Sequence, residues 1–194
     1  MINQTYQQGV IQVFNFTRNS AGQLPTSTKV AGGAATAAVA VAAVMAILVP
    51  FTGGWEGFAT HPYIDWVGTG HPETWCYGET GADTHGKVPP LSATFTKAEC
   101  TAELQDKLTT IYYPAIMKCV KVPMGVNRTA ALVDAAYNLG PSAVCNGAIV
   151  RNINAGNPAA GCQALKAYVY ASGRVVQGLI NRRAAEYKLC MEND

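Results

Sequence analysis

The sequence predicts an α+β fold: a small lobe with short strands, a long helix and a helical lobe, preceded by an N-terminal transmembrane helix. Three stretches of different character predict this order. Residues 30–49 are apolar and uncharged, residues 50–83 mix Gly, Pro, Thr and aromatic residues without a helical period, and helical signals follow from residue 96. Of the 194 residues, 49% are hydrophobic and 13% are charged, so we expect a buried core.

Charge separates the N-terminal part of the chain from the rest. Arg18 and Lys29 are the only charged residues before Glu56, which is the first acidic residue. The whole chain carries 14 basic and 12 acidic residues, a formal net charge of +2. This balance lacks the basic excess that binding to phosphate backbones requires, so we do not expect nucleic acid as a partner.

The apolar run is long enough to cross a membrane. Twenty uncharged residues at 30–49 make a helix about as long as a bilayer core is thick. Nine of them are Ala and two are Gly, so a buried core helix is an alternative, whereas the 29 residues in front disfavour a cleavable signal peptide. Lys29 directly before the run predicts that residues 1–29 stay in the cytoplasm and that residues 50–194 are exported.

The cysteines predict disulfides in the exported part. Six cysteines lie after the apolar run, and an even number in an exported domain is typical of disulfide bonds, although fifteen pairings are open. Zinc is disfavoured because the chain has no C-x-x-C pair and its three histidines fit no zinc spacing, so we expect no metal and no cofactor. The cysteines are Cys76, Cys100, Cys119, Cys145, Cys162 and Cys190, and the histidines are His61, His71 and His85.

Local signals predict the helices in order. Thr96 and Glu99 form a capping box that opens a long helix, and Pro114 is expected to kink it. A second helix stops at Gly140, and Asn157 is expected to cap a later one. The five expected helices run from Thr96 to residue 120 and over residues 127–140, 142–154, 158–171 and 175–190.

The last expected helix, residues 175–190, has an apolar side and a charged side. This pattern is typical of a helix that packs on the core with its apolar side. The apolar side carries Val176, Leu179, Ile180 and Ala184, and Arg182, Arg183, Glu186 and Lys188 lie mostly on the other side.

Acidic residues are scarce where chemistry is expected. Between residues 50 and 95 the chain has Glu56, Asp65, Glu73, Glu79 and Asp83. A carboxyl at the end of a helix and a second one on a turn nine residues later can face each other across a cleft, as acid and base do in glycoside hydrolysis. The alternative for any such pair is two solvated surface carboxylates.

The residues around this pair resemble the phage-type lysozymes of glycoside hydrolase family 24. The family pattern is Glu-Gly, a Tyr-x-Asp turn and Thr followed by a Tyr-Gly turn, and here it appears as WEGF, PYIDWVG and TWCYGETGAD. Further matches are ALVDAAYNLG, IVRNINAGN and GLINRRAAE, so the resemblance covers residues 54–190. It implies a lysozyme-like fold, a catalytic domain at residues 50–194 and a peptidoglycan substrate.

The resemblance also implies roles for single residues. The reaction is hydrolysis of the β-1,4 bond between N-acetylmuramic acid and N-acetylglucosamine, with Glu56 as the acid that protonates the leaving oxygen. Asp65 is expected to activate or hold water or to stabilise the oxocarbenium-like transition state, and Thr74 to place that water. Supporting or substrate-binding positions are Tyr63, Tyr77 and Arg182, with Arg182 expected near Glu56 on the closing helix. A diffusing lysozyme of this size is expected to be a monomer.

Two departures from the family pattern concern the turn after Asp65. Thr74 follows Asp65 by nine positions instead of the usual six, because residues 69–73 lengthen the turn. The family commonly has His after Tyr-Gly, where this chain has Glu79. Either Glu79 itself or His71, in the inserted residues, can replace that histidine; a solvated loop histidine is the alternative for His71.

The apolar run resembles the signal-anchor-release segment of a subgroup of these endolysins. Such a segment first tethers the enzyme and later leaves the bilayer, which fits a helix rich in Ala and Gly. The run has no cysteine, so control by tethering is expected rather than disulfide exchange. Residues 30–49 are thus expected to bind the bacterial inner membrane, with the catalytic domain in the periplasm until it is released there to lyse the host.

Two rival functions are open at this point. A cysteine peptidase or amidase acting on the peptide stems of peptidoglycan would use Cys76 as nucleophile and His85 as base. A non-catalytic, membrane-anchored wall-binding module would stack Tyr63, Trp66, Trp75 and Tyr77 on sugars.

Overall fold

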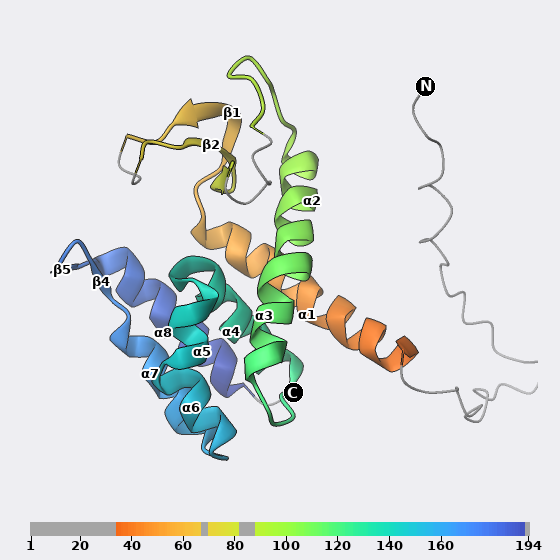
Figure 1. The fold of residues 1–194 in the computed structure, drawn as a ribbon, viewed down its shortest axis with the longest axis vertical. Coiled ribbons are helices and arrows are strands. Elements are labelled where there is room, and N and C mark those ends of the chain that lie inside the picture. Colours follow the sequence, from red (N-terminus) through yellow and green to blue (C-terminus); the bar gives the residue numbers. More distant parts are fainter. Residues whose placement is uncertain (1–33, 67–69, 82–87, 193–194) are drawn as a thin grey trace, which may run out of the picture. The chain divides into compact units, whose positions relative to one another are not determined.

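The computed structural model describes residues 34–66, 70–81 and 88–192 (Figure 1). The predicted cytoplasmic tail, the first residues of the predicted membrane segment, and Thr69, Asp83 and His85 lie outside the described residues. Residues 36–194 form one compact unit, which the following paragraphs describe. It is an α+β structure with small antiparallel sheets among helices, as the sequence predicts.

The first helix, α1 (Ala34–Trp55), contains residues 34–49 of the predicted membrane segment and contributes to the core. Val44, Met45 and Leu48 are buried, and the helix continues through Pro50, so residues 50–55 are helical rather than strand and turn. Burial on both sides of Pro50 outweighs the lost backbone hydrogen bond that a proline imposes. In the described part of the chain, no helix combines the length and apolar character needed to cross a membrane.

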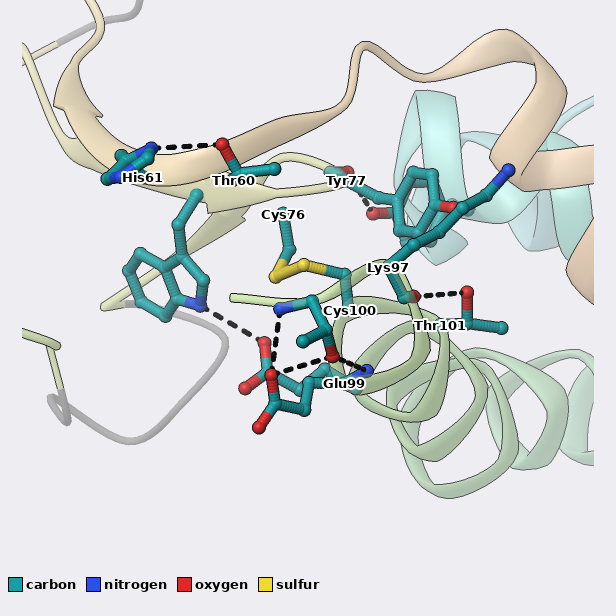
Figure 2. Close-up of a disulfide and its surroundings, with 12 residues drawn as sticks. Thr60, His61, Cys76, Tyr77, Lys97, Glu99, Cys100 and Thr101 are labelled. Atoms are coloured by element: carbon teal, nitrogen blue, oxygen red, sulfur yellow. Dashed lines mark hydrogen bonds between the residues drawn. A yellow bond between two sulfur atoms is a disulfide. The ribbon is translucent and has the colours of Figure 1, made fainter. Parts of the chain in front are cut away.

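The strand-bearing part follows α1 as predicted. Strands β1 (Ala59–Ile64), β2 (Glu73–Cys76) and β3 (Glu79–Thr80) form an antiparallel sheet in that order. The sheet is attached to the next helix by the disulfide between Cys76 and Cys100, shown in Figure 2, and by a 3.1 Å hydrogen bond from Trp75 Nε1 to a Glu103 carboxylate oxygen. These links fix the end of β2, which leads into the candidate site.

The long helix is interrupted where the proline predicts a distortion. It consists of α2 (Lys97–Lys107), a π-helical segment η1 (Leu108–Tyr112) and α3 (Tyr113–Cys119), which continue along one line in Figure 1. The predicted capping box between Thr96 and Glu99 is present. Because Pro114 has no N–H to donate, the turn before it widens, and the N–H of Tyr113 bonds to the carbonyl of Leu108.

The helical part follows with more breaks than predicted. Its helices are α4 (Val126–Leu139), α5 (Pro141–Asn146), α6 (Ala148–Asn154), α7 (Pro158–Ala164) and α8 (Gln177–Met191), with the 3₁₀ segment η2 (Leu165–Ala167) after α7. The predicted end of α4 at Gly140 and the predicted cap at Asn157 are confirmed.

Two predicted helices in this part are wrong in extent. The helix expected over 142–154 is divided at Gly147, where a Cβ would stand 2.5 Å from the carbonyl oxygen of Ala143. The helix expected over 158–171 ends early, and β4 (Tyr170–Ala171) pairs with β5 (Arg174–Val175) in a hairpin. Ser172 and Gly173 both have positive φ, as a tight hairpin turn requires.

Disulfides are confirmed, and each joins cysteines that are neighbours in sequence. Besides the bridge from β2 to α2, Cys119–Cys145 links α3 to α5 and Cys162–Cys190 links α7 to α8. Each bridge closes a loop of fewer than 30 residues, so it restrains one pair of adjacent elements.

Candidate active site

Glu56 lies directly after the last turn of α1, as the sequence predicts. Its N–H donates to the carbonyl of Thr52 at 3.2 Å, which continues the helical hydrogen bonding by one residue. Its side chain is 21% exposed. A carboxyl in this position is held by a rigid element while one side of it reaches a cleft.

The cleft is a pocket of about 260 Å³. Glu56 shares it with residues from the turn after β2, from α2, from η1 and from α4. The lining residues are Glu56, Tyr77, Gly78, Lys107, Tyr112, Tyr137 and Asn138. Charged and amide groups beside tyrosine rings provide the hydrogen bonds and flat faces that a sugar unit needs.

Arg182 contacts Glu56, so the expected proximity of these two residues is confirmed. Arg182 Nη1 donates to Glu56 Oε1 at 2.6 Å. The guanidinium is almost fully buried, and its other nitrogens bond to Asp134 on α4. Burial opposes its charge, but Asp134 and Glu56 raise the pKa of Arg182 through their charges and hydrogen bonds, so it remains a cation.

The predicted orientation of the last helix is wrong. Arg182, Arg183 and Glu186 face inward and are buried, whereas Val176 and Ile180 are each 37% exposed. The charged side of α8 packs against α4, where Asp134 has no exposed surface and accepts hydrogen bonds from Arg182. Hydrophobic patterning missed this because the buried groups neutralise one another across two helices.

Asp134 and Asn138 are functional candidates that sequence reasoning missed. Asp134 interrupts an apolar run in ALVDAAYNLG, and an acidic residue in the buried face of a helix was the available signal. Asn138 lines the pocket, and Arg183 Nη2 donates to its Oδ1 at 2.7 Å. Because arginine can only donate, the amide nitrogen of Asn138 is left as the donor of that side chain.

Glu186 completes the buried cluster. Burial, together with the hydrogen bond and charge of Asp134, raises the pKa of Glu186 to about 9, although Arg183 and Arg182 oppose this. The carboxyl lies 2.9 Å from Arg183 Nη2, yet among the described residues neither of its oxygens has a well-aligned hydrogen-bond donor. The fold therefore favours the protonated form of Glu186, and burial lowers the pKa of Arg183 beside it.

Asp65, Thr74 and Tyr63 form a second group at the β1–β2 turn. Both Asp65 and Thr74 bond to the carbonyl of Pro72, Asp65 through its N–H at 2.9 Å and Thr74 through its hydroxyl at 3.3 Å. Tyr63 is the cross-strand partner of Thr74. The lengthened turn thus closes on itself and keeps the two proposed catalytic residues together. Within the described chain these three residues do not line the pocket that contains Glu56, whereas Tyr77 does.

Glu79, rather than His71, occupies the buried position after Tyr-Gly. Its carboxylate lies 3.0 Å from Lys107 Nζ, and both side chains are nearly inaccessible. Lys107 in turn lies over the ring of Tyr137, which lines the same pocket. His71 is exposed, with its ring beside that of Trp66. The Glu79–Lys107 ion pair therefore fastens the β3 end of the sheet to α2.

Comparison with known proteins agrees with this geometry. The family model described as phage lysozyme matches residues 53–186, which include Glu56 and Arg182. The chain belongs to the phage lysozyme family. It is therefore a glycoside hydrolase of the lysozyme type, with a lysozyme-like α+β fold, and neither rival function is favoured. The peptidase in addition lacks its nucleophile, because Cys76 is bonded to Cys100.

Two relatives and one solved structure illustrate this lysozyme's membership. It is 34% identical to a SAR-endolysin of Enterobacteria phage P21, over 87% of this chain and 98% of the relative. It is 32% identical to a SAR-endolysin of Escherichia phage Mu, over 68% of this chain and 71% of the relative. The endolysin from Escherichia coli O157:H7 phage FAHEc1 superimposes with a TM-score of 0.65 at 25% identity, covering 74% of this chain and 90% of that structure.

Proposed function

We propose that this lysozyme hydrolyses the β-1,4 bond between N-acetylmuramic acid and N-acetylglucosamine of peptidoglycan, and so lyses the bacterial host when phage are released. The observation that carries the proposal is the Glu56 carboxyl, which lines the pocket while Arg182 holds it at 2.6 Å. Membership of the phage lysozyme family supports a glycosidic substrate.

Glu56 acts as the general acid. Its proton passes to the glycosidic oxygen as the bond to the anomeric carbon breaks, which turns a poor leaving group into a neutral hydroxyl. Arg182 keeps one carboxylate oxygen engaged, so the carboxyl presents a single orientation to the cleft. After the transfer, the positive charge of Arg182 stabilises the carboxylate that remains.

Asp65 and Thr74 act on the sugar ring and on the attacking water. The Asp65 carboxylate stabilises the positive charge that develops on the sugar ring and activates or holds the attacking water. The Thr74 hydroxyl helps to place that water. Their common attachment to the Pro72 carbonyl supports a joint role, since it sets the spacing between the two residues.

Side chains of the pocket bind the sugar. The amide nitrogen of Asn138 is a donor on the pocket wall, suited to the carbonyl of an N-acetyl group or to a hydroxyl. Tyr77 contributes an apolar face, and its backbone carbonyl is held by the Tyr137 hydroxyl at 2.9 Å. Tyr63, 47% exposed on β1, is available to contact substrate beside Thr74. We also propose that the enzyme acts as a monomer.

We further infer that residues 30–49 act as a signal-anchor-release segment. Residues 1–29 remain in the cytoplasm, the catalytic domain is exported to the periplasm, and the segment later leaves the inner membrane. The naming of the relatives as SAR-endolysins supports this. So does the burial of Val44, Met45 and Leu48, because the same apolar side chains that would face lipid find an alternative environment in the protein core.

Product analysis on purified peptidoglycan tests the proposal. A muramidase releases new reducing ends and no new amines, and the reducing sugar is N-acetylmuramic acid. New amino groups would identify a peptidase or amidase, and binding without product would identify a wall-binding module. A reducing end on N-acetylglucosamine would contradict the proposed bond while leaving a glycosidase.

A further inference from the structure

One buried carboxylate connects three elements around the candidate acid. Asp134, on α4, has no exposed surface. Its Oδ1 accepts from Thr52 Oγ1 on α1 at 2.8 Å and from Arg182 Nη2 on α8 at 2.9 Å, and its Oδ2 accepts from Arg182 Nε at 3.2 Å. All three bonds are made by side chains that are themselves buried.

The Arg182 guanidinium hydrogen-bonds two carboxylates along different edges, and its Nε also lies 3.3 Å from Glu186 Oε1. The edge formed by Nε and Nη2 faces Asp134, and Nη1 faces Glu56. The guanidinium is planar and rigid, so fixing one edge with two hydrogen bonds fixes the direction of the remaining donor. Asp134 therefore determines where Arg182 meets Glu56.

Thr52 gives Asp134 a second connection to the acid. Thr52 lies four residues before Glu56, and the Glu56 N–H bonds to the Thr52 carbonyl. The two residues are thus one helical turn apart on the same side of the chain. A side-chain bond from Thr52 to Asp134 fixes the rotation and height of the turn from which Glu56 projects.

We propose that Asp134 is a positioning residue for catalysis, which sets the place of the Glu56 carboxyl both through Arg182 and through Thr52. The inference rests on the proposed role of Glu56 as the general acid. Small displacements of an acid relative to its substrate lower the rate strongly, because the proton must be delivered along a hydrogen bond to one oxygen.

Asp134 also balances charge next to the acid. The titratable groups around it are Arg182, Arg183 and Glu186 from α8, with Glu56 beyond Arg182 on the side of α1. Asp134 makes two hydrogen bonds to Arg182, so it is the carboxylate that most directly offsets the charge next to Glu56. Without that negative charge, Arg182 would favour the ionised form of Glu56, and an ionised acid has no proton to give.

The test with least effect on folding replaces Thr52. Thr52→Val keeps the volume and removes the donor, whereas Thr52→Ser keeps the hydroxyl. We expect the full-length Thr52→Val protein to lose about tenfold in kcat on purified peptidoglycan with KM nearly unchanged, and Thr52→Ser to recover most of the loss. The matched control is Thr129→Val, which removes a buried hydroxyl bonded to the Gly125 carbonyl on α4; its kcat stays within about twofold of wild type.

A second variant, Asp134→Asn, tests the charge. The alkaline limb of the kcat profile is expected to move to lower pH by about one unit, because Arg182 is no longer offset. A purely structural role for Asp134 would lower kcat and leave the limb where it is. If Asp134→Asn does not fold, the kcat values of Thr52→Val and Thr52→Ser alone test the inference.

The inference is overturned if Thr52→Val keeps kcat within about twofold of wild type, if Thr52→Ser fails to rescue it, or if folded Asp134→Asn keeps the wild-type alkaline limb. Glu56→Gln, measured in parallel, separates this from the function itself. An inactive Glu56→Gln with a normal Thr52→Val removes only the role of Asp134, whereas an active Glu56→Gln removes the proposed acid.

Discussion

The two carboxyls proposed for catalysis are held in different ways. Glu56 depends on the packing of helices, because its N–H bonds to Thr52 in the last turn of α1 and Arg182 on α8 holds its side chain. Asp65 depends on a local turn, because its N–H bonds to the carbonyl of Pro72 within the lengthened β1–β2 connection. Changes in helix packing should therefore act on the acid, and changes in the turn on the second carboxylate.

Exchange of Asp65 tests the assignment within that turn. Asp65→Asn keeps the shape and removes the charge, so we expect activity to fall by about a hundredfold or more in release of reducing ends. Glu73→Gln and Asp83→Asn serve as controls and should stay within a few-fold of wild type. A larger loss for Glu73→Gln than for Asp65→Asn would show that the inserted turn was misaligned and that Glu73 is the second carboxylate.

For single residues, the sequence indicates which side chains are candidates for the site, but not which distant residues they contact. Glu56, Asp65 and Thr74 can be proposed from sequence because the family pattern around them is local. The partner of Glu79 could not, since Lys107 lies 28 residues away and nothing in the spacing connects them. The structure places Glu79 in a buried ion pair and His71 on the surface beside Trp66, a difference in burial that their positions in the sequence do not indicate.

Among the elements, α8 shows most clearly how tertiary context overrides amphipathic patterning. Its buried face carries Arg182, Arg183 and Glu186, while Val176 and Ile180 remain partly exposed. This arrangement is stable only because α4 supplies Asp134 and Asn138 as partners. The buried charges make the packing of α4 on α8 sensitive to pH.

The raised pKa of Glu186 predicts that the protein becomes less stable as the pH rises. The Glu186 pKa is near 4.5 in the unfolded chain and about 9 in the folded protein, so the native state binds the extra proton between these values. The stabilising contribution is complete below about pH 4.5 and is lost as pH rises toward 9. We expect the free energy of unfolding to fall across this window by at most about 1.4 kcal/mol per pH unit, and Glu186→Gln, neutral in both states, to flatten the slope.

Denaturant titrations of wild type and Glu186→Gln between pH 5 and 9 measure how the free energy of unfolding depends on pH. Glu192→Gln, an exposed glutamate directly after α8, is the control. Equal slopes of the free energy of unfolding against pH for wild type and Glu186→Gln would mean that Glu186 is ionised in the folded protein and forms an ion pair with Arg183.

The helix boundaries show which elements a sequence can predict. The capping box at Thr96, the stop at Gly140 and the cap at Asn157 are local chemistry, and all three are confirmed. The break at Gly147 was missed because the Tyr168 hydroxyl approaches it closely, which is a tertiary contact. The β4–β5 hairpin was missed because two-residue strands leave almost no periodic signal.

On the scale of the whole molecule, α1 is part of both the predicted membrane anchor and the protein core. The predicted anchor ends at residue 49, yet α1 runs from Ala34 to Trp55 and buries Val44, Met45 and Leu48 in the core. A weakly apolar segment suits this double use, because each Ala gains little in lipid compared with Leu or Ile. If the segment is released as we propose, we expect the free-energy difference between the bilayer and the core to be small.

Replacement of small residues in the anchor tests release. Leu at Ala37, Ala38, Ala40, Ala42 and Ala43 strengthens insertion, so we expect the exported domain to stay at the membrane and lysis to be delayed or lost. Fractionation before and after an uncoupler should show wild type moving from the membrane pellet to the soluble fraction, and the variant remaining. Wild type that stays wholly in the pellet, or becomes soluble only after cleavage near Pro50, would replace release by a fixed anchor or a signal peptide.

The most direct measurement is the release of reducing ends from peptidoglycan by Glu56→Gln. Glutamine keeps an acceptor for Arg182 Nη1 and the volume of the side chain, but it has no proton to transfer. We expect the variant to unfold at the wild-type temperature and to lose activity by a factor of about 10² to 10⁴ or more. A folded Glu56→Gln protein that still releases reducing ends at a substantial fraction of the wild-type rate would contradict Glu56 as the catalytic acid.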